Sequence, residues 1–96
     1  MSKSLECART LFIKIYQEEP KDSNALDKFI EALAELSERE EAVLLTRHGL
    51  EDGQPKSAKE VSLIYGVSES TIRRVESVAI KKLRHPTRYN RIKEKE

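Results

Sequence analysis

Polar side chains with complementary hydrogen-bonding groups gather on one short stretch, SESTIRR at residues 68–74. Arg73 and Arg74 carry guanidinium groups, which donate paired hydrogen bonds to phosphate oxygens or to the edge of a guanine base. Glu69 and Ser70 add an acceptor and a hydroxyl group about one helical turn earlier. Because neighbouring residues of a helix point about 100° apart, the two arginines cannot contact the same group. The stretch therefore favours contact with nucleic acid.

Residues 57–86 are predicted to form two helices joined by a tight turn, and this unit positions the polar stretch. Ser57 and Glu60 have the spacing of a capping box, and Gly66 can take the positive φ with which helices often end. Ser68 can cap the second helix, whose apolar side chains form one stripe: Ile72, Val75, Ala79, Ile80 and Leu83. A helix-turn-helix places the first turns of its second helix in the major groove of DNA. The alternative is an αα-corner in a helical bundle, with its charged face in water.

The whole chain is expected to be all-α, with about five helices near residues 5–18, 24–35, 38–48, 58–65 and 69–84. Ser23 or Asn24 is expected to cap the second of these helices. Gly49 should end the third, with Leu50 closing it through an apolar contact. Residues 88–96 alternate charges around only two apolar side chains, which predicts a frayed tail.

The predicted core draws apolar residues from the last four helices and the tight turn. Its members are Leu26, Phe29, Leu33, Val43, Leu44, Val61, Ile64, Val67, Ile72, Val75, Ala79 and Leu83. A further apolar stripe on residues 5–16 has the three- and four-residue steps of an amphipathic helix and is expected to be ordinary core. Alternatively, the first two helices could offer an apolar groove to a helix of a partner protein.

Length and composition limit the classes of function. Ninety-six residues make one domain, and without a bilayer-spanning run or a signal peptide the chain is expected in the cytoplasm. The lone Cys7 cannot form an internal disulfide. Zinc-ligand spacing, a glycine-rich phosphate loop and a catalytic cluster are all missing from the sequence. The sequence therefore predicts a protein that is not an enzyme and that has no cofactor, metal or small-molecule substrate.

Charge is divided unevenly along the chain, although the net charge is only +1. Residues 1–56 carry eight Lys and Arg against twelve Asp and Glu, whereas residues 57–96 carry ten against five. DNA phosphates would attract the basic half and repel the acidic half. The alternative is that these charges only keep the surface soluble.

Three segments, in order, resemble region 4 of the sigma-70 family, the promoter-recognition subunits of bacterial RNA polymerase. They are LSEREEAVLLTRHGL (36–50), SAKEVSLIYGVS (57–68) and IRRVESVAIKKLRHPTR (72–88). The resemblance covers 53 of the 96 residues. It implies a sigma region 4-like helix-turn-helix domain at 36–88, preceded by N-terminal amphipathic helices at 1–35 and followed by a charged tail at 89–96. Taken as a whole natural chain, this would be a stand-alone region-4-like protein.

The resemblance implies roles for eight residues on double-stranded promoter DNA. Those matching the family's backbone contacts are Arg39, Arg47, Ser57, Ala58 and Arg73. Those at the positions that read a −35-type element are Glu69, Ser70 and Arg74. The resemblance also implies that an apolar surface of residues 26–50 binds the flap of the beta subunit of the RNA polymerase core. An activator or an anti-sigma protein is a further implied partner.

The sequence departs from the family at several positions. Primary sigma factors read the −35 element with an Arg-Glu pair and a Gln where this chain has Glu69, Ser70 and Arg74. Leu45 replaces an arginine that contacts phosphate, and His48 replaces the usual phenylalanine.

Two other functions therefore stay open. The first is an ordinary helix-turn-helix regulator that dimerises through its N-terminal helices. The second is a sigma mimic that binds polymerase or an anti-sigma protein without reading DNA. If the protein binds the flap, as a sigma-related factor or as a sigma mimic, residues 5–35 are expected either to cover the flap-binding surface or to extend it.

Overall fold

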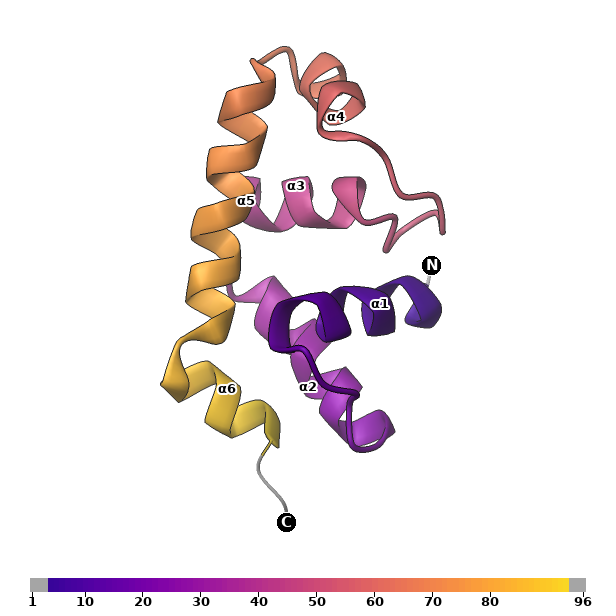
Figure 1. The fold of residues 1–96 in the computed structure, drawn as a ribbon, viewed down its shortest axis with the longest axis vertical. Coiled ribbons are helices and arrows are strands. Elements are labelled where there is room, and N and C mark those ends of the chain that lie inside the picture. The colour runs from indigo at the N-terminus through magenta and orange to yellow at the C-terminus, as the bar shows by residue number, and fades with distance from the viewer. Residues whose placement is uncertain (1–3, 94–96) are drawn as a thin grey trace.

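The structure, a computed structural model, describes residues 4–93, and within that range it consists of helices without strands (Figure 1). The helices are α1 (Leu5–Tyr16), α2 (Ser23–Ala34), α3 (Glu38–Arg47), α4 (Ala58–Tyr65), α5 (Glu69–Arg84) and α6 (Pro86–Lys93). The predicted all-α class is confirmed. The five predicted helices lie within two residues of their expected bounds, and α6 is an additional one.

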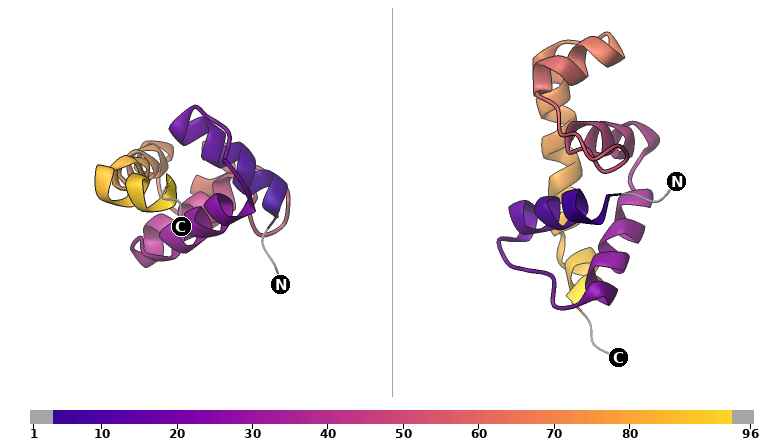
Figure 2. Two further views of the ribbon diagram at one scale, coloured as in Figure 1. Left: turned by 90° about the horizontal axis from the view of Figure 1, so that it is seen from below. Right: turned by 90° about the vertical axis from the view of Figure 1, so that its right-hand side faces the viewer.

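Helix α5 runs along most of the molecule, which measures 43 × 25 × 21 Å along its principal axes. Helices α4 and α6 lie at its opposite ends, as two perpendicular views agree (Figures 1 and 2). Between those ends, α3 and α1 pack against α5 as well. The helix that carries the polar stretch is thus also the one against which α1, α3, α4 and α6 pack.

The larger of two apolar clusters lies between α1, α2, α6 and the C-terminal half of α5. Its buried members, called here the large cluster, are Ala8, Leu11, Phe12, Ile15, Leu26, Phe29, Ala32, Leu33, Leu36, Leu44, Leu45, Leu50, Ala79, Leu83 and Ile92. Phe12 and Phe29 meet edge to face with ring centroids 5.3 Å apart. The stripe predicted on residues 5–16 is therefore core within this chain.

A small cluster of Val43, Ala58, Val61 and Ile72 holds the helix-turn-helix against α3. Val67 and Val75 are half-buried and pack against it, as predicted for the turn and the second motif helix. Helix α3 contributes to both clusters because Val43 faces one way, while Leu44 and Leu45 face the other.

Ile64 was expected in the core, and this prediction is wrong, since its side chain is 58% exposed. Helix α4 packs against α3 and α5, and the residues that fill this contact are Ala58, Val61 and Ser62. Three residues beyond Val61, Ile64 lies at the edge of this narrow face and turns toward water. Leu63, beside it, is 73% exposed.

The frayed tail expected at residues 88–96 is corrected for residues 88–93, because Pro86–Lys93 forms α6, while residues 94–96 lie outside the described range. Pro86 suits the first position of a helix, where no backbone N–H is needed. Ile92 is buried in the large cluster, and Tyr89 stacks on Tyr16 with ring centroids 5.1 Å apart. Two apolar side chains three residues apart are too few for a periodicity argument, yet both find partners on other helices.

The caps mostly follow the sequence. Asp22, rather than Ser23 or Asn24, caps α2, and its carboxylate accepts a hydrogen bond from the Ala25 N–H. Gly49 has a positive φ of 70° directly after His48, the C-cap of α3, and Leu50 is fully buried behind it, so α3 ends where predicted. A Cβ at Gly49 would lie 2.6 Å from the backbone of Gln54 and Pro55, so the loop folds tightly over this glycine.

Ile72→Ala should lower the free energy of unfolding by about 2–5 kcal/mol, because truncating a closely packed side chain removes apolar contact and leaves a cavity. Ile64→Ala makes the same chemical change at an exposed position and should cost within about 0.5 kcal/mol. Urea unfolding followed by circular dichroism measures both. Equal costs for the two variants would contradict the packing described for α4 and α5.

Candidate nucleic-acid interface

The helix-turn-helix is built from local hydrogen bonds that the sequence predicts. In the capping box of α4, the Glu60 N–H donates to the Ser57 hydroxyl at 3.1 Å, and the Ser57 N–H donates to the Glu60 carboxylate at 2.8 Å. Gly66 ends α4 in the left-handed region, with a φ of 69°. Ser68 then caps α5 by accepting from the Thr71 N–H at 3.1 Å. The predicted turn is confirmed.

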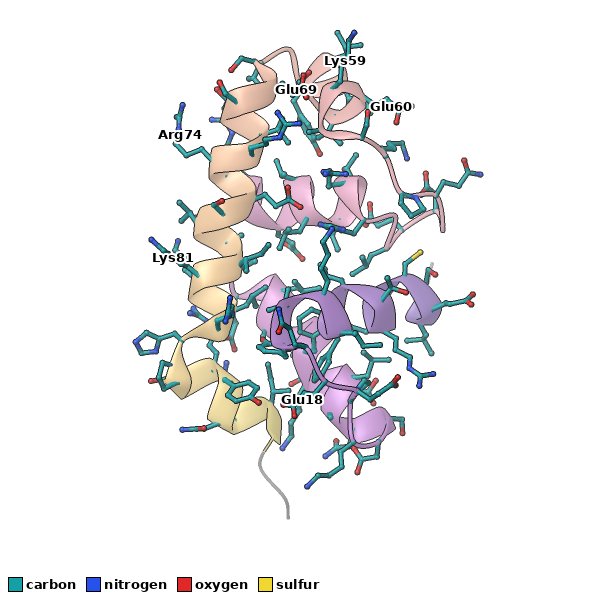
Figure 3. All side chains as sticks on the ribbon, in the orientation of Figure 1. Glu18, Lys59, Glu60, Glu69, Arg74 and Lys81 are labelled. Atoms are coloured by element: carbon teal, nitrogen blue, oxygen red, sulfur yellow. The ribbon has the colours of Figure 1, made fainter. Side chains whose placement is uncertain are left out.

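The three base-reading candidates lie in the first turns of α5. Ser70 is exposed, and its hydroxyl lies 3.1 Å from that of Ser68. Glu69 pairs with Arg73 one turn later, with 2.8 Å between the carboxylate and guanidinium atoms. Arg74 is exposed and projects from the side of α5 away from α3 and α4 (Figure 3). The two arginines therefore face different surroundings, as their adjacent positions predict.

The backbone-contact candidates are spread over α3, the start of α4 and α5. Arg39 is exposed on the first turn of α3, and Ser57 is exposed at the start of α4. The Ala58 side chain is buried in the small cluster, so only its backbone N–H is available to a phosphate. Lys59, which the sequence argument overlooked, points outward from the same first turn of α4 (Figure 3).

Arg47 is held inside the protein by two neighbouring groups. It donates a hydrogen bond to the Lys56 carbonyl at 2.5 Å, and its Nε lies 3.6 Å from a carboxylate oxygen of Glu76 on α5. Its side chain is only 26% exposed. In this arrangement Arg47 joins the end of α3 to the loop before α4 and to α5.

His48 contacts the same carboxylate, a pairing that sequence reasoning missed. Its Nε2 donates to Glu76 Oε2 at 2.6 Å, and the two side chains are 11% and 13% exposed. The residues lie 28 positions apart, and neither stands in a pattern that signals the other. A histidine at a helix end commonly interacts with the last carbonyls of that helix, which gives no indication of a distant carboxylate.

Burial alone would raise the pKa of Glu76, but the hydrogen bond from His48 and the charges of His48, Arg47 and Lys14 outweigh it. The net effect is a pKa below the ordinary value of 4.5. Glu76 therefore acts as an ionised tie between α3 and α5, just below the turns that carry Arg73 and Arg74.

The surface expected to bind a flap is not open. Within residues 26–50, all of which the structure describes, no large apolar side chain is exposed. Leu26, Phe29 and Leu33 of α2, and Leu44 and Leu45 of α3, lie in the large cluster.

Two further observations concern residues 4–93 only. No helix in this range combines the length and apolar character needed to cross a membrane. In the same range, no group of three or more His, Cys, Asp or Glu side chains is placed to hold a metal ion.

Comparison with known proteins places this geometry in a family context. The sequence profile described as Sigma-70, region 4 matches residues 32–85. The RNA polymerase sigma factor SigA of a Bacillus species is 42% identical over 79 residues, which cover 78% of this chain and 21% of that protein. The chain thus spans about a fifth of the length of this relative.

The tie at Glu76 predicts a pH dependence of stability. Because the folded pKa of Glu76 lies below 4.5, the ionised carboxylate contributes its full stabilisation above that value and loses it as the pH falls through the folded pKa. From about pH 5 to about pH 3, the free energy of unfolding should fall more steeply for the wild type than for Glu76→Gln. Urea titrations at a series of pH values measure this difference.

Glu31→Gln, at an exposed position of α2, is the matched control and should follow the wild type. A Glu76→Gln profile parallel to that of the wild type would show that the tie contributes nothing.

Proposed function

The chain belongs to the sigma-70 region 4 family, and from that premise we propose that it is a sigma-related transcription factor that binds promoter DNA and the RNA polymerase flap. Region 4 is a DNA-binding module and not an enzyme, and in sigma factors it binds −35 promoter DNA. The step beyond the family is that this chain reads its DNA site with Glu69, Ser70 and Arg74.

The observation that carries the proposal is the exposure of Arg74 at the start of a helix whose far side is fixed. Ile72, two residues earlier, is buried in the small cluster and sets the rotation of α5. Arg74 consequently extends into water with its guanidinium free to approach a base edge (Figure 3). Arginine pairs best with O6 and N7 of guanine, whereas the family's glutamine favours adenine. We therefore expect a changed preference at one base pair.

Glu69 limits what Arg73 can do. Their ion pair is exposed at both ends, with 63% and 42% of the side chains accessible, so breaking it costs at most about 1 kcal/mol. Arg73 can exchange the carboxylate for a phosphate, and Glu69 can then accept from the amino group of a cytosine. Arg73 would hold the backbone while Glu69 and Arg74 read bases.

The remaining phosphate contacts would come from Arg39, Ser57, Ala58 and Arg47. Arg39 is exposed and carries its own positive charge. Ser57 and Ala58 lie at the N-terminus of α4, which favours anions. Lys59 adds a positive charge there. Arg47 would reach a phosphate only by leaving the Lys56 carbonyl, which makes it the weakest of these candidates.

The regulator alternative receives less support than the sigma-related function. It needs free apolar stripes on the N-terminal helices for dimerisation. In this structure Leu11, Phe12 and Ile15 of α1 and Phe29 and Leu33 of α2 are buried within one chain.

The two arginines should have different effects on DNA binding. Arg73→Ala should weaken binding to all sequences and lower the salt slope by about one, because a phosphate contact carries no sequence information. Arg74→Ala should cost about 1–3 kcal/mol on the preferred site and relax the preference at one position. Selection from random duplexes, followed by salt titrations, measures both effects.

Lys81→Ala is the matched control for this selection. It removes one charge from an exposed position two turns after Arg74 on α5, and it should leave the selected sequence unchanged. If Arg74→Ala weakens every sequence equally, Arg74 holds phosphate only. If the wild type enriches no sequence, the result contradicts base reading and favours the sigma mimic, which does not read DNA.

Binding to polymerase is tested separately. The immobilised full chain should capture the RNA polymerase core. It should not capture a core enzyme that lacks the flap. Capture that does not depend on the flap would contradict the proposed partner surface while leaving DNA binding intact.

A further inference from the structure

Helix α1 lies outside the part of the chain that matches the region 4 family, which begins at residue 32. It nevertheless buries four side chains, Ala8, Leu11, Phe12 and Ile15, in the large cluster. These positions follow steps of three, one and three residues and form one stripe along the helix. Most of α2 also precedes residue 32, so α1 contacts the matching part of the chain mainly through α5.

The face beneath α1 is formed by α2 and α5. Phe29 of α2 meets the rings of Phe12 and Tyr16 at centroid distances of 5.3 and 5.9 Å. Ala79 and Leu83 of α5 belong to the same cluster and have no exposed surface with α1 in place. Phe29 also falls within residues 26–50, where the flap-binding surface was expected.

The connections of α1 to the rest of the protein are light in polar contacts. At its N-terminal end the Ser4 N–H donates to the Leu50 carbonyl at 2.5 Å, and at its C-terminal end the Tyr16 hydroxyl donates to the Leu83 carbonyl at 2.9 Å. The segment that follows begins at Gln17, which holds a positive φ of 58° that disfavours residues other than glycine. Residues 17–22 are mostly exposed.

Release of α1 would also break two contacts with Tyr89 of α6. The Tyr16 ring stacks on that of Tyr89, and the Tyr89 hydroxyl donates a hydrogen bond to the Glu18 carboxylate. Helix α1 and the start of the following segment would therefore have to leave together.

We propose that α1 is a removable cover, and that an amphipathic helix of the polymerase flap displaces it and occupies the face of α2 and α5. The incoming helix would present apolar side chains spaced like those of α1, since they must meet the same residues. This inference rests on the proposed binding to the flap and adds how the surface becomes available. While α1 stays docked, the apparent affinity for the flap is reduced by the fraction of molecules in which it is released.

Hydrogen exchange on the full chain, alone and bound to the RNA polymerase core, tests the cover. Amides of α1 should exchange faster in the complex, whereas those of α2 and of the C-terminal half of α5 should be protected. Binding with α1 still protected would overturn the cover and leave the proposed partner standing. Failure of the chain to bind the core at all would contradict both the partner and the cover.

A pair of Tyr→Phe variants gives an independent measure. Tyr16→Phe keeps the ring packing but removes the hydrogen bond from α1 to α5, so α1 should be released more often and the core bound about two- to tenfold more tightly. Tyr65→Phe removes a hydroxyl that lies 3.0 Å from the Thr46 hydroxyl and 3.3 Å from the Ala42 carbonyl, between α4 and α3 and away from α1, and it should leave affinity unchanged. Equal affinities for the two variants would overturn the cover.

Discussion

The packing of α5 against its neighbours is the constraint on which the rest of the structure depends. Ile72 fixes its first turns in the small cluster, while Ala79 and Leu83 fix its last turns in the large one. These buried positions leave no freedom in the rotation of the helix. The direction of Arg74 and the shape of the face beneath α1 are therefore set by one stripe of apolar side chains.

Glu76 is the polar counterpart of that stripe. It lies midway along α5 and contacts both Arg47 and His48 at the end of α3. At this point ion pairs, rather than apolar side chains, hold α3 and α5 together. Its ionisation depends on those two partners, because an unpaired charge at this depth would be costly. The phenylalanine that the family resemblance implies at position 48 could pack here but could not donate to Glu76. The hydrogen bond to Glu76 therefore requires a histidine, or another donor, at position 48.

Most of the fold could be predicted from the sequence because caps and stripes are local signals. Ser57, Gly66 and Ser68 specify the motif through contacts within four residues of the chain, and these were found where expected. Ile64 was misplaced because helical spacing does not give the width of the face that neighbours cover. Helix α6 and the contact between His48 and Glu76 depend on residues far apart in sequence, for which periodicity carries no information.

The loop closed over Gly49 has a consequence for how the length of the chain can vary. A side chain at Gly49 would collide with the backbone of Gln54 and Pro55, and the Lys56 N–H is fastened to the Arg47 carbonyl at 2.8 Å. These contacts therefore fix the distance between the end of α3 and the cap of α4. Gly53 is different, because a Cβ there would meet nothing within 4 Å. Insertions should accumulate at this outer tip, and deletions that draw Ser57 toward α3 should be selected against.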